Sequence, residues 1–194
     1  MRVFIAVLIL IFSFQSWTRA DDIQDFEIEG ISIGDSLLDY MTKKEIKSSR
    51  RNYVKNKKYY AVGYDENLNN YDQLDIYLKS GDNKYIVRSL GGTIFMKTKE
   101  CLIKKKEIIE ELRDIFSNAT ESTYDNVSHS YDKSGKSKQH STGFLLKNNN
   151  DDDHIRVECL DWSKKFENEN NWQDNLNVSA YSKEILMWFK SGYK

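Results

Sequence analysis

The sequence YDQLDIYLKSGDN, residues 71–83, predicts a β-strand that ends in a tight turn. Every second residue from Leu74 to Leu78 is apolar, which is the pattern of a strand with one buried face. Ser80-Gly81-Asp82-Asn83 consists of turn-forming residues, and a further strand is predicted at 85–96. Strands joined by so short a loop are antiparallel neighbours, because a parallel crossover needs about a dozen residues or more.

The same period of two recurs on both sides of this hairpin. Further strands are predicted at 59–64, 123–131, 141–146, 154–161 and 176–181.

An apolar stripe at helical spacing predicts one long helix, at 98–116. Short helices are predicted near 36–41, from Thr42 with its capping-box partner Glu45, and after Ser182. Together the elements predict an α+β fold, an antiparallel meandering sheet with helices packed on one face. Their order also allows two helix-plus-meander halves.

The first twenty residues have the pattern of a cleavable signal peptide. Arg2 precedes the apolar run Val3 to Phe14, and Thr18-Arg19-Ala20 offers small residues for cleavage. A run of this length is too short to span a bilayer core of ~30 Å as a helix. We therefore expect residues 21–194 to form a single exported domain, periplasmic or secreted, without stable membrane insertion.

The charge balance gives no sign of a nucleic-acid partner. The chain has 29 basic and 30 acidic residues, and loss of Arg2 and Arg19 with the signal leaves 27 against 30. Cys101 and Cys159 are an even pair, for which a disulfide is the simplest state in an oxidising compartment. A metal site at the two cysteines would lack close spacing and nearby histidines, so we predict no metal and no cofactor there.

The segment Ile33-Gly34-Asp35-Ser36-Leu37 resembles the first block of the GDSL, or SGNH, esterases. The later Asp-x-x-His block of that family matches Asp151-Asp152-Asp153-His154. The resemblance implies a nucleophile at Ser36, assisted by Asp151 and His154. The family's Gly-x-Asn-Asp block, which supplies an oxyanion donor, is absent, and its sheet is parallel. The favoured interpretation is therefore a turn and helix N-cap with no catalytic residues, and the esterase is the alternative.

Two segments are candidate binding surfaces. Residues 43–58 are strongly basic and could face an anionic polymer, lipid headgroups or an acidic partner. Trp162 and Trp172 flank a polar segment, where exposed aromatic rings would stack on sugars or anchor a partner. The residues selected for binding are Arg50, Arg51, Lys55, Lys57, Trp162 and Trp172. For each segment the alternative is an ordinary structural role.

The remaining polar clusters give weaker signals. The acidic run at 151–153 with His154 suggests a calcium ligand set, but consecutive residues point in different directions, so a solvated turn is preferred. His129 and His140 lie in polar sequence and are predicted to be exposed, titrating side chains.

The segment FEIEGISIGDSLLDY, residues 26–40, resembles a family of small exported proteins from AT-rich bacterial genomes that has no assigned function. An Ile-x-x-Gly start before short helices and a meander also resembles the BamE/SmpA envelope proteins. Neither likeness implies catalytic residues. The sequence thus predicts an exported protein that binds an envelope protein or a surface polymer without catalysis; the alternative is an SGNH-like esterase.

Overall fold

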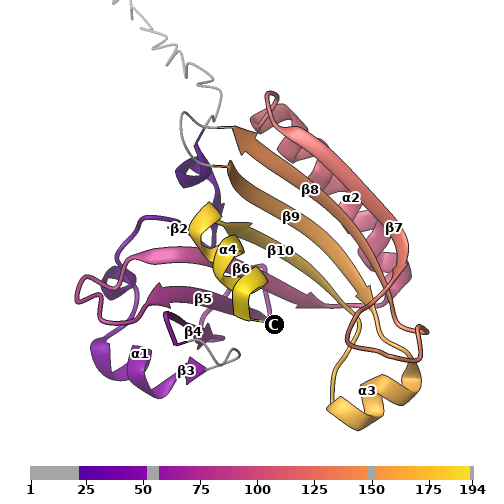
Figure 1. Ribbon diagram of the computed structural model, residues 1–194, viewed down its shortest axis with the longest axis horizontal. Helices are drawn as coiled ribbons and strands as arrows, with labels where there is room; N and C mark the ends of the chain where they lie inside the picture. The colour runs from indigo at the N-terminus through magenta and orange to yellow at the C-terminus, as the bar shows by residue number, and fades with distance from the viewer. Residues whose placement is uncertain (1–21, 52–56, 148–151, 193–194) are drawn as a thin grey trace, which may run out of the picture.

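The computed structural model describes residues 22–51, 57–147 and 152–192 (Figure 1). The predicted signal peptide, Lys55 and Asp151 lie outside these ranges. None of the helices within them is both long enough and apolar enough to cross a bilayer.

An eight-stranded antiparallel sheet organises the structure, and the α+β class is confirmed. Its strands, in chain order, are β3 (Arg50–Arg51), β4 (Tyr59–Tyr64), β5 (Gln73–Lys79), β6 (Val87–Phe95), β7 (Thr120–Ser128), β8 (Lys138–Lys147), β9 (Asp152–Asp161) and β10 (Asn175–Tyr181). Two four-stranded meanders, β3–β6 and β7–β10, meet where β10 pairs with β6, which gives the order β3-β4-β5-β6-β10-β9-β8-β7. A separate hairpin consists of β1 (Glu27–Ile28) and β2 (Ile31–Ser32).

Each meander follows a helix, as the sequence pattern allowed. Helix α1 (Lys43–Ser48) begins with the predicted capping box, in which Thr42 and Glu45 satisfy each other's backbone N–H groups. Helix α2 (Thr98–Ile115) matches the long helix of the sequence pattern. Short 3₁₀ turns, η1 (Ile23–Asp25) and η2 (Leu37–Asp39), lie near the N-terminal hairpin.

The apolar side chains at every second position of the strands lie on one face of the sheet and form the main core. Leu74 and Ile76 of β5, Val157 of β9 and Val178 of β10 are all fully buried or nearly so. Helix α2 packs on this face against β9 and β10. The predicted disulfide is present: Cys101 of α2 is bonded to Cys159 of β9, with 5.9 Å between their Cα atoms. The bond fixes the helix to the middle of the sheet.

The sequence predicted that all helices would pack on one face of the sheet, but the structure has helices on both faces. Helix α4 (Lys183–Gly192) packs its Trp188 against Tyr59 and Tyr77, whose side chains project from the opposite face. Figure 1 shows α4 in front of the sheet and α2 behind β7 and β8. A short helix that was not predicted, α3 (Lys164–Asn170), lies in the connection from β9 to β10. The second face therefore remains open between α3 and α4.

Removal of the disulfide by Cys101→Ser with Cys159→Ser should lower the free energy of unfolding. The bond closes a loop with a sequence separation of 58 residues. The chain-entropy model assigns such a loop about 4 kcal/mol, so we expect a loss of about 2–4 kcal/mol in urea unfolding. Reductant should destabilise the wild-type protein equally and leave the double variant unchanged. Equal stability of the reduced and oxidised wild-type protein would contradict this role.

Candidate functional site

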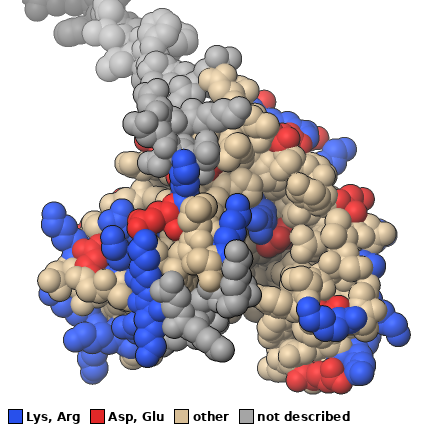
Figure 2. All heavy atoms as spheres, viewed as in Figure 1, with Lys and Arg blue, Asp and Glu red and all other residues tan. Residues whose placement is uncertain are grey.

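The open face of the sheet contains a hollow of about 1150 Å³. It lies between the part of the molecule that carries α4 and the part that carries α3, and the surface is indented there (Figure 2). Its floor comes from β5, β6, β9 and β10, and its sides come from α4, the β7–β8 turn and the β9–β10 connection. Segments distant in the sequence therefore meet in one surface.

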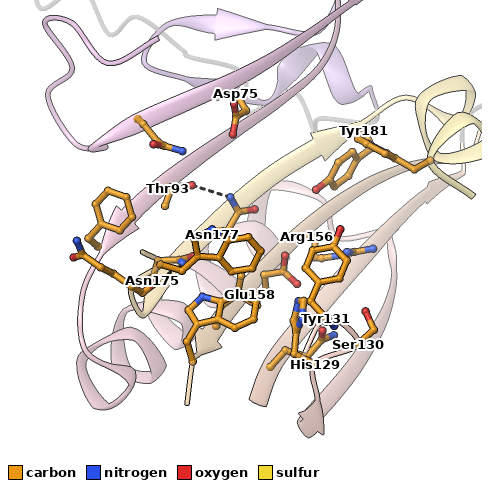
Figure 3. A pocket seen from close by; sticks show the side chains of 18 of the residues that line it. Asp75, Thr93, His129, Ser130, Tyr131, Arg156, Glu158, Asn175, Asn177 and Tyr181 are labelled. Carbon is orange, nitrogen blue, oxygen red and sulfur yellow. Dashed lines mark hydrogen bonds between the residues drawn. The ribbon is translucent and has the colours of Figure 1, made fainter. Parts of the chain in front are cut away.

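The floor is polar because it is formed by the residues that alternate with the buried core residues along each strand and so point to the opposite face. The strand register places Thr93, Asn177 and Glu158 side by side on β6, β10 and β9. The Asn177 amide donates to the Thr93 hydroxyl at 3.1 Å, and its oxygen accepts from Ser179 at 3.1 Å. Figure 3 shows these side chains pointing into the hollow with Asn175 beside them. The amide of Asn177 is thus held in a fixed orientation.

Aromatic side chains form one side of the hollow. Trp162, directly after β9, contacts Trp172 at 4.8 Å and His129 at 4.5 Å between ring centroids. Tyr131 lies next to both, 6.0 Å from Trp172 and 5.1 Å from His129. Trp162 is buried, whereas Tyr131 is 48% and Trp172 39% exposed. The cluster therefore offers ring surface to the solvent from a buried base.

Buried carboxylates hold this aromatic side in place. Asp132 in the β7–β8 turn accepts hydrogen bonds from Ser137 and from Ser163, the N-cap of α3. Hydrogen bonds from Ser134 and Ser137 keep the pKa of Asp132 well below its usual range. Asp174 accepts the backbone N–H of Trp162 at 2.9 Å. The turn and the connection are therefore joined by charge-assisted hydrogen bonds.

The opposite end of the hollow is formed by α4 and by cationic side chains. The Arg156 guanidinium lies over the ring of Tyr181, 5.7 Å from its centroid. Phe189 of α4 packs edge-on against Tyr181, and Lys190 follows it on the same helix. Both Arg156 and Lys190 line the hollow.

Glu158 is the carboxylate at the centre of the floor. Burial raises the pKa of this carboxyl, and nearby Arg156 and Lys105 oppose the shift. Within the described ranges no hydrogen bond or ion pair reaches its oxygen atoms. Asp75, which also lines the hollow, lies 3.5 Å from the guanidinium of Arg51. Glu158 is therefore an acceptor for a donor that a ligand would bring.

The structure brings together the two predicted tryptophans but not the basic residues. Arg50 lies over the ring of Tyr60, at 4.1 Å, and Arg51 pairs with Asp75, so both contact their own chain. They belong to β3, at the far edge of the sheet from the second meander, and Lys57 is exposed in the turn before β4. The basic segment and the tryptophans are thus separate surfaces.

Neither His129 nor His140 is an exposed side chain, which corrects the sequence-based expectation. His129 packs against Trp162, and burial lowers its pKa. His140 pairs with Asp125 from the neighbouring strand. Polar neighbours in the sequence concealed aromatic and carboxylate partners that only the folded chain supplies.

The residues of the esterase motif have other partners. Ser36 is the N-cap of η2, where its hydroxyl donates to the carbonyl of Lys84 at 2.8 Å and accepts from the Leu38 N–H. His154 lies in β9 on the open face, where its ring stacks on Tyr181. Its Nδ1 atom is buried without a hydrogen-bond partner among the described side chains. No contact in the described ranges joins Ser36 to His154.

Most of the hollow was missed by the sequence analysis. The missed residues are Asp75, Thr93, His129, Tyr131, Arg156, Glu158, Asn175, Asn177 and Lys190. For the residues on β9 and β10 a signal was present, because the polar positions of these strands alternate with the predicted core residues and therefore face away from the core. Among the described residues, no group of three or more His, Cys, Asp or Glu side chains is arranged to hold a metal ion.

Comparisons of the chain with protein-family models, with curated proteins and with solved structures found no match. The function must therefore be inferred from the residues of the hollow themselves.

Acid should destabilise the protein through His154. Burial, with Arg156 and Lys190 nearby, lowers the pKa of this histidine from 6.5 to about 4. Between these values the unfolded chain binds a proton that the native state does not, so stability falls as pH falls through this window. We expect a loss on the order of 2 kcal/mol from pH 6.5 to pH 4.5.

This loss should be smaller in His154→Gln, as measured by urea unfolding at pH 6.5, 5.5 and 4.5, since the variant cannot take up the proton. Glu158 contributes with the opposite sign, because a raised carboxyl pKa adds stability at low pH and loses it as pH rises. It is retained in both proteins, so the comparison isolates the histidine. Identical pH profiles would contradict the assignment.

Ser36→Ala should act on stability. The substitution removes the cap of η2 and the bond to Lys84, and we expect unfolding to become easier by about 1 kcal/mol. A chromogenic short-chain ester tests the alternative directly. Hydrolysis by the wild-type protein that Ser36→Ala abolishes would support the esterase and overturn the interpretation of Ser36 as a cap.

Proposed function

We propose that this protein is an exported, non-catalytic binding protein that holds a surface polysaccharide in the hollow on its sheet. One observation carries the proposal: a hydrogen-bonding floor lies beside aromatic rings that remain exposed. Phe95, Tyr131 and Trp172 all line the hollow, and each is more than a third exposed. Exposed aromatic rings around a concave polar surface are typical of ligand sites.

The two parts of the hollow complement the two kinds of surface on a sugar ring. The C–H faces of a pyranose are apolar and pack on aromatic rings, as Tyr131 and Trp172 provide. The hydroxyl groups at the rim of the sugar both donate and accept. The floor offers carboxylate oxygens at Glu158 and amide donors and acceptors at Asn175 and Gln73.

The arrangement of acidic groups favours binding over hydrolysis. Two carboxylates from the described part of the chain line the hollow, Asp75 on β5 and Glu158 on β9. Their strands are three spacings apart in the order β5-β6-β10-β9, about 14 Å in a flat sheet. Glycosidases need their two carboxyl groups about 5–10 Å apart. Asp75 is moreover paired with Arg51.

The disulfide supports a location outside the cytoplasm, where such bonds persist. It agrees with the signal peptide expected from the sequence, and a surface polysaccharide is then within reach of the protein.

The test is binding to an array of bacterial surface polysaccharides, followed by calorimetry with the best oligosaccharide. Tyr131→Ala should weaken binding about tenfold or more, since an aromatic anchor contributes more than 1 kcal/mol. The matched control is Tyr40→Ala, because Tyr40 is 40% exposed, against 48% for Tyr131, and does not line the hollow. The control should bind as the wild-type protein does.

Two results would contradict the proposal. One is the absence of any bound glycan together with capture of an envelope protein, which would favour the other predicted partner class. The second is equal loss of glycan binding in Tyr131→Ala and Tyr40→Ala, which would place the ligand elsewhere.

A further inference from the structure

We propose that the α4 end of the hollow is an anion subsite, in which Arg156 and Lys190 bind a carboxylate or phosphate group, so that the ligand is an acidic polysaccharide. This inference rests on the proposed function, because it assigns a chemical class to the polymer in the same hollow. Figure 3 shows Arg156 and Tyr181 at the end of the floor away from Asn175.

Arg156 is held in position without an ion-pair partner among the described residues. Its guanidinium rests on the ring of Tyr181, a contact that uses the face of the group. Within the described ranges no carboxylate forms an ion pair with Arg156 or with Lys190. The N–H groups at the edge of the guanidinium are therefore available for the two-pronged contact that arginine makes with carboxylate and phosphate.

The two cations converge on one place. Arg156 lies on β9 and Lys190 on α4, both line the hollow, and both act on the partly buried ring of His154, whose pKa they help to lower. The histidine itself stays neutral at ordinary pH, so it does not repel a further cation. Among the described residues, two carboxylates line the hollow. Asp75 is paired with Arg51, and Glu158 lies two residues along β9 from Arg156 without forming an ion pair with it.

Small residues on β10 and β6 leave room on one side of Arg156 for the anion. Its cross-strand neighbours are Ser179 on β10 and Gly143 on β8, and Gly91 continues the row on β6. The ring of His154 covers Gly143, where an added Cβ would meet it at 2.4 Å. The room beside the guanidinium therefore lies on the β10 side, over Ser179 and Gly91.

The distance to the aromatic side indicates an oligomer. Trp162 is six positions after Arg156 along extended chain, which is about 20 Å along the strand direction. A single monosaccharide does not reach both ends. A chain of several sugars can place one ring on Tyr131 and Trp172, its hydroxyls on Glu158 and Asn177, and its anionic group on Arg156.

The experiment compares acidic oligosaccharides with neutral ones of the same length. The probes are alginate-derived hexasaccharides, the same hexasaccharides after carboxyl reduction, and a phosphorylated mannose oligosaccharide, each titrated by calorimetry. The wild-type protein should bind an acidic probe at least tenfold more tightly than the neutral one. The preference should diminish as NaCl is raised, because salt screens exposed charges. Whichever acidic probe binds better identifies carboxylate or phosphate as the natural group.

Arg156→Gln should lower the affinity for the acidic probe about tenfold and leave the neutral probe unchanged. Lys190→Gln, at an exposed position where folding is not at risk, should give a smaller loss of the same kind. Arg156→Lys should restore part of the preference. The matched control is Lys99→Gln, since Lys99 is exposed on α2, behind the sheet.

The outcomes separate the two proposals. If Tyr131→Ala weakens both probes while Arg156→Gln and Lys190→Gln leave their affinity ratio unchanged, the polysaccharide site stands and the anion subsite is overturned. If the neutral probe binds as tightly as the acidic ones, the anion subsite is overturned as well. If no probe binds and the Tyr131 variant changes nothing, the proposed function itself fails.

Discussion

The pairing of β6 with β10 is the interaction on which the rest of the structure depends. It joins two meanders that are each local in the sequence, over seven residue pairs from Asn175–Phe95 to Tyr181–Ser89. Because it brings strands of the two halves into one sheet, it produces both a core wide enough to bury α2 and an open face that is continuous from β5 to β8. Neither half alone would contain the hollow.

The same alternation that forms the core also forms the candidate site. Val157 and Cys159 face α2, so Arg156 and Glu158 must face the other way. This part was predictable, as were the strands, the long helix and the disulfide, since all rest on local periodicity or on cysteine pairing. The strand order was not, because it depends on contacts between residues about 85 positions apart in the chain. Without the strand order, the polar residues that face away from the core could not be assigned to one hollow.

Local motifs were poor guides to the site for a related reason. Gly34-Asp35-Ser36 has the letters of an esterase block, yet Asp35 accepts the N–H of Ser32 and Ser36 caps a 3₁₀ turn. Arg50 and Arg51 have the charge of a docking surface, yet each contacts an aromatic ring or a carboxylate of its own sheet. Short polar motifs satisfy backbone and side-chain groups far more often than they catalyse.

The exposed aromatic residues are the feature that folding alone does not explain. An antiparallel sheet needs only one buried face, and here α2 and the main core cover it. The polar side chains on the other face are well solvated. Tyr131 and Trp172 contact His129 and Trp162, yet both rings remain more than a third exposed, which adds a risk of association. Yet Asp132 and Asp174 use buried, charge-assisted hydrogen bonds to hold the segments that carry these rings. Such reinforcement of a solvent-facing aromatic surface is expected where that surface binds, because a rigid site loses less conformational entropy when the ligand arrives.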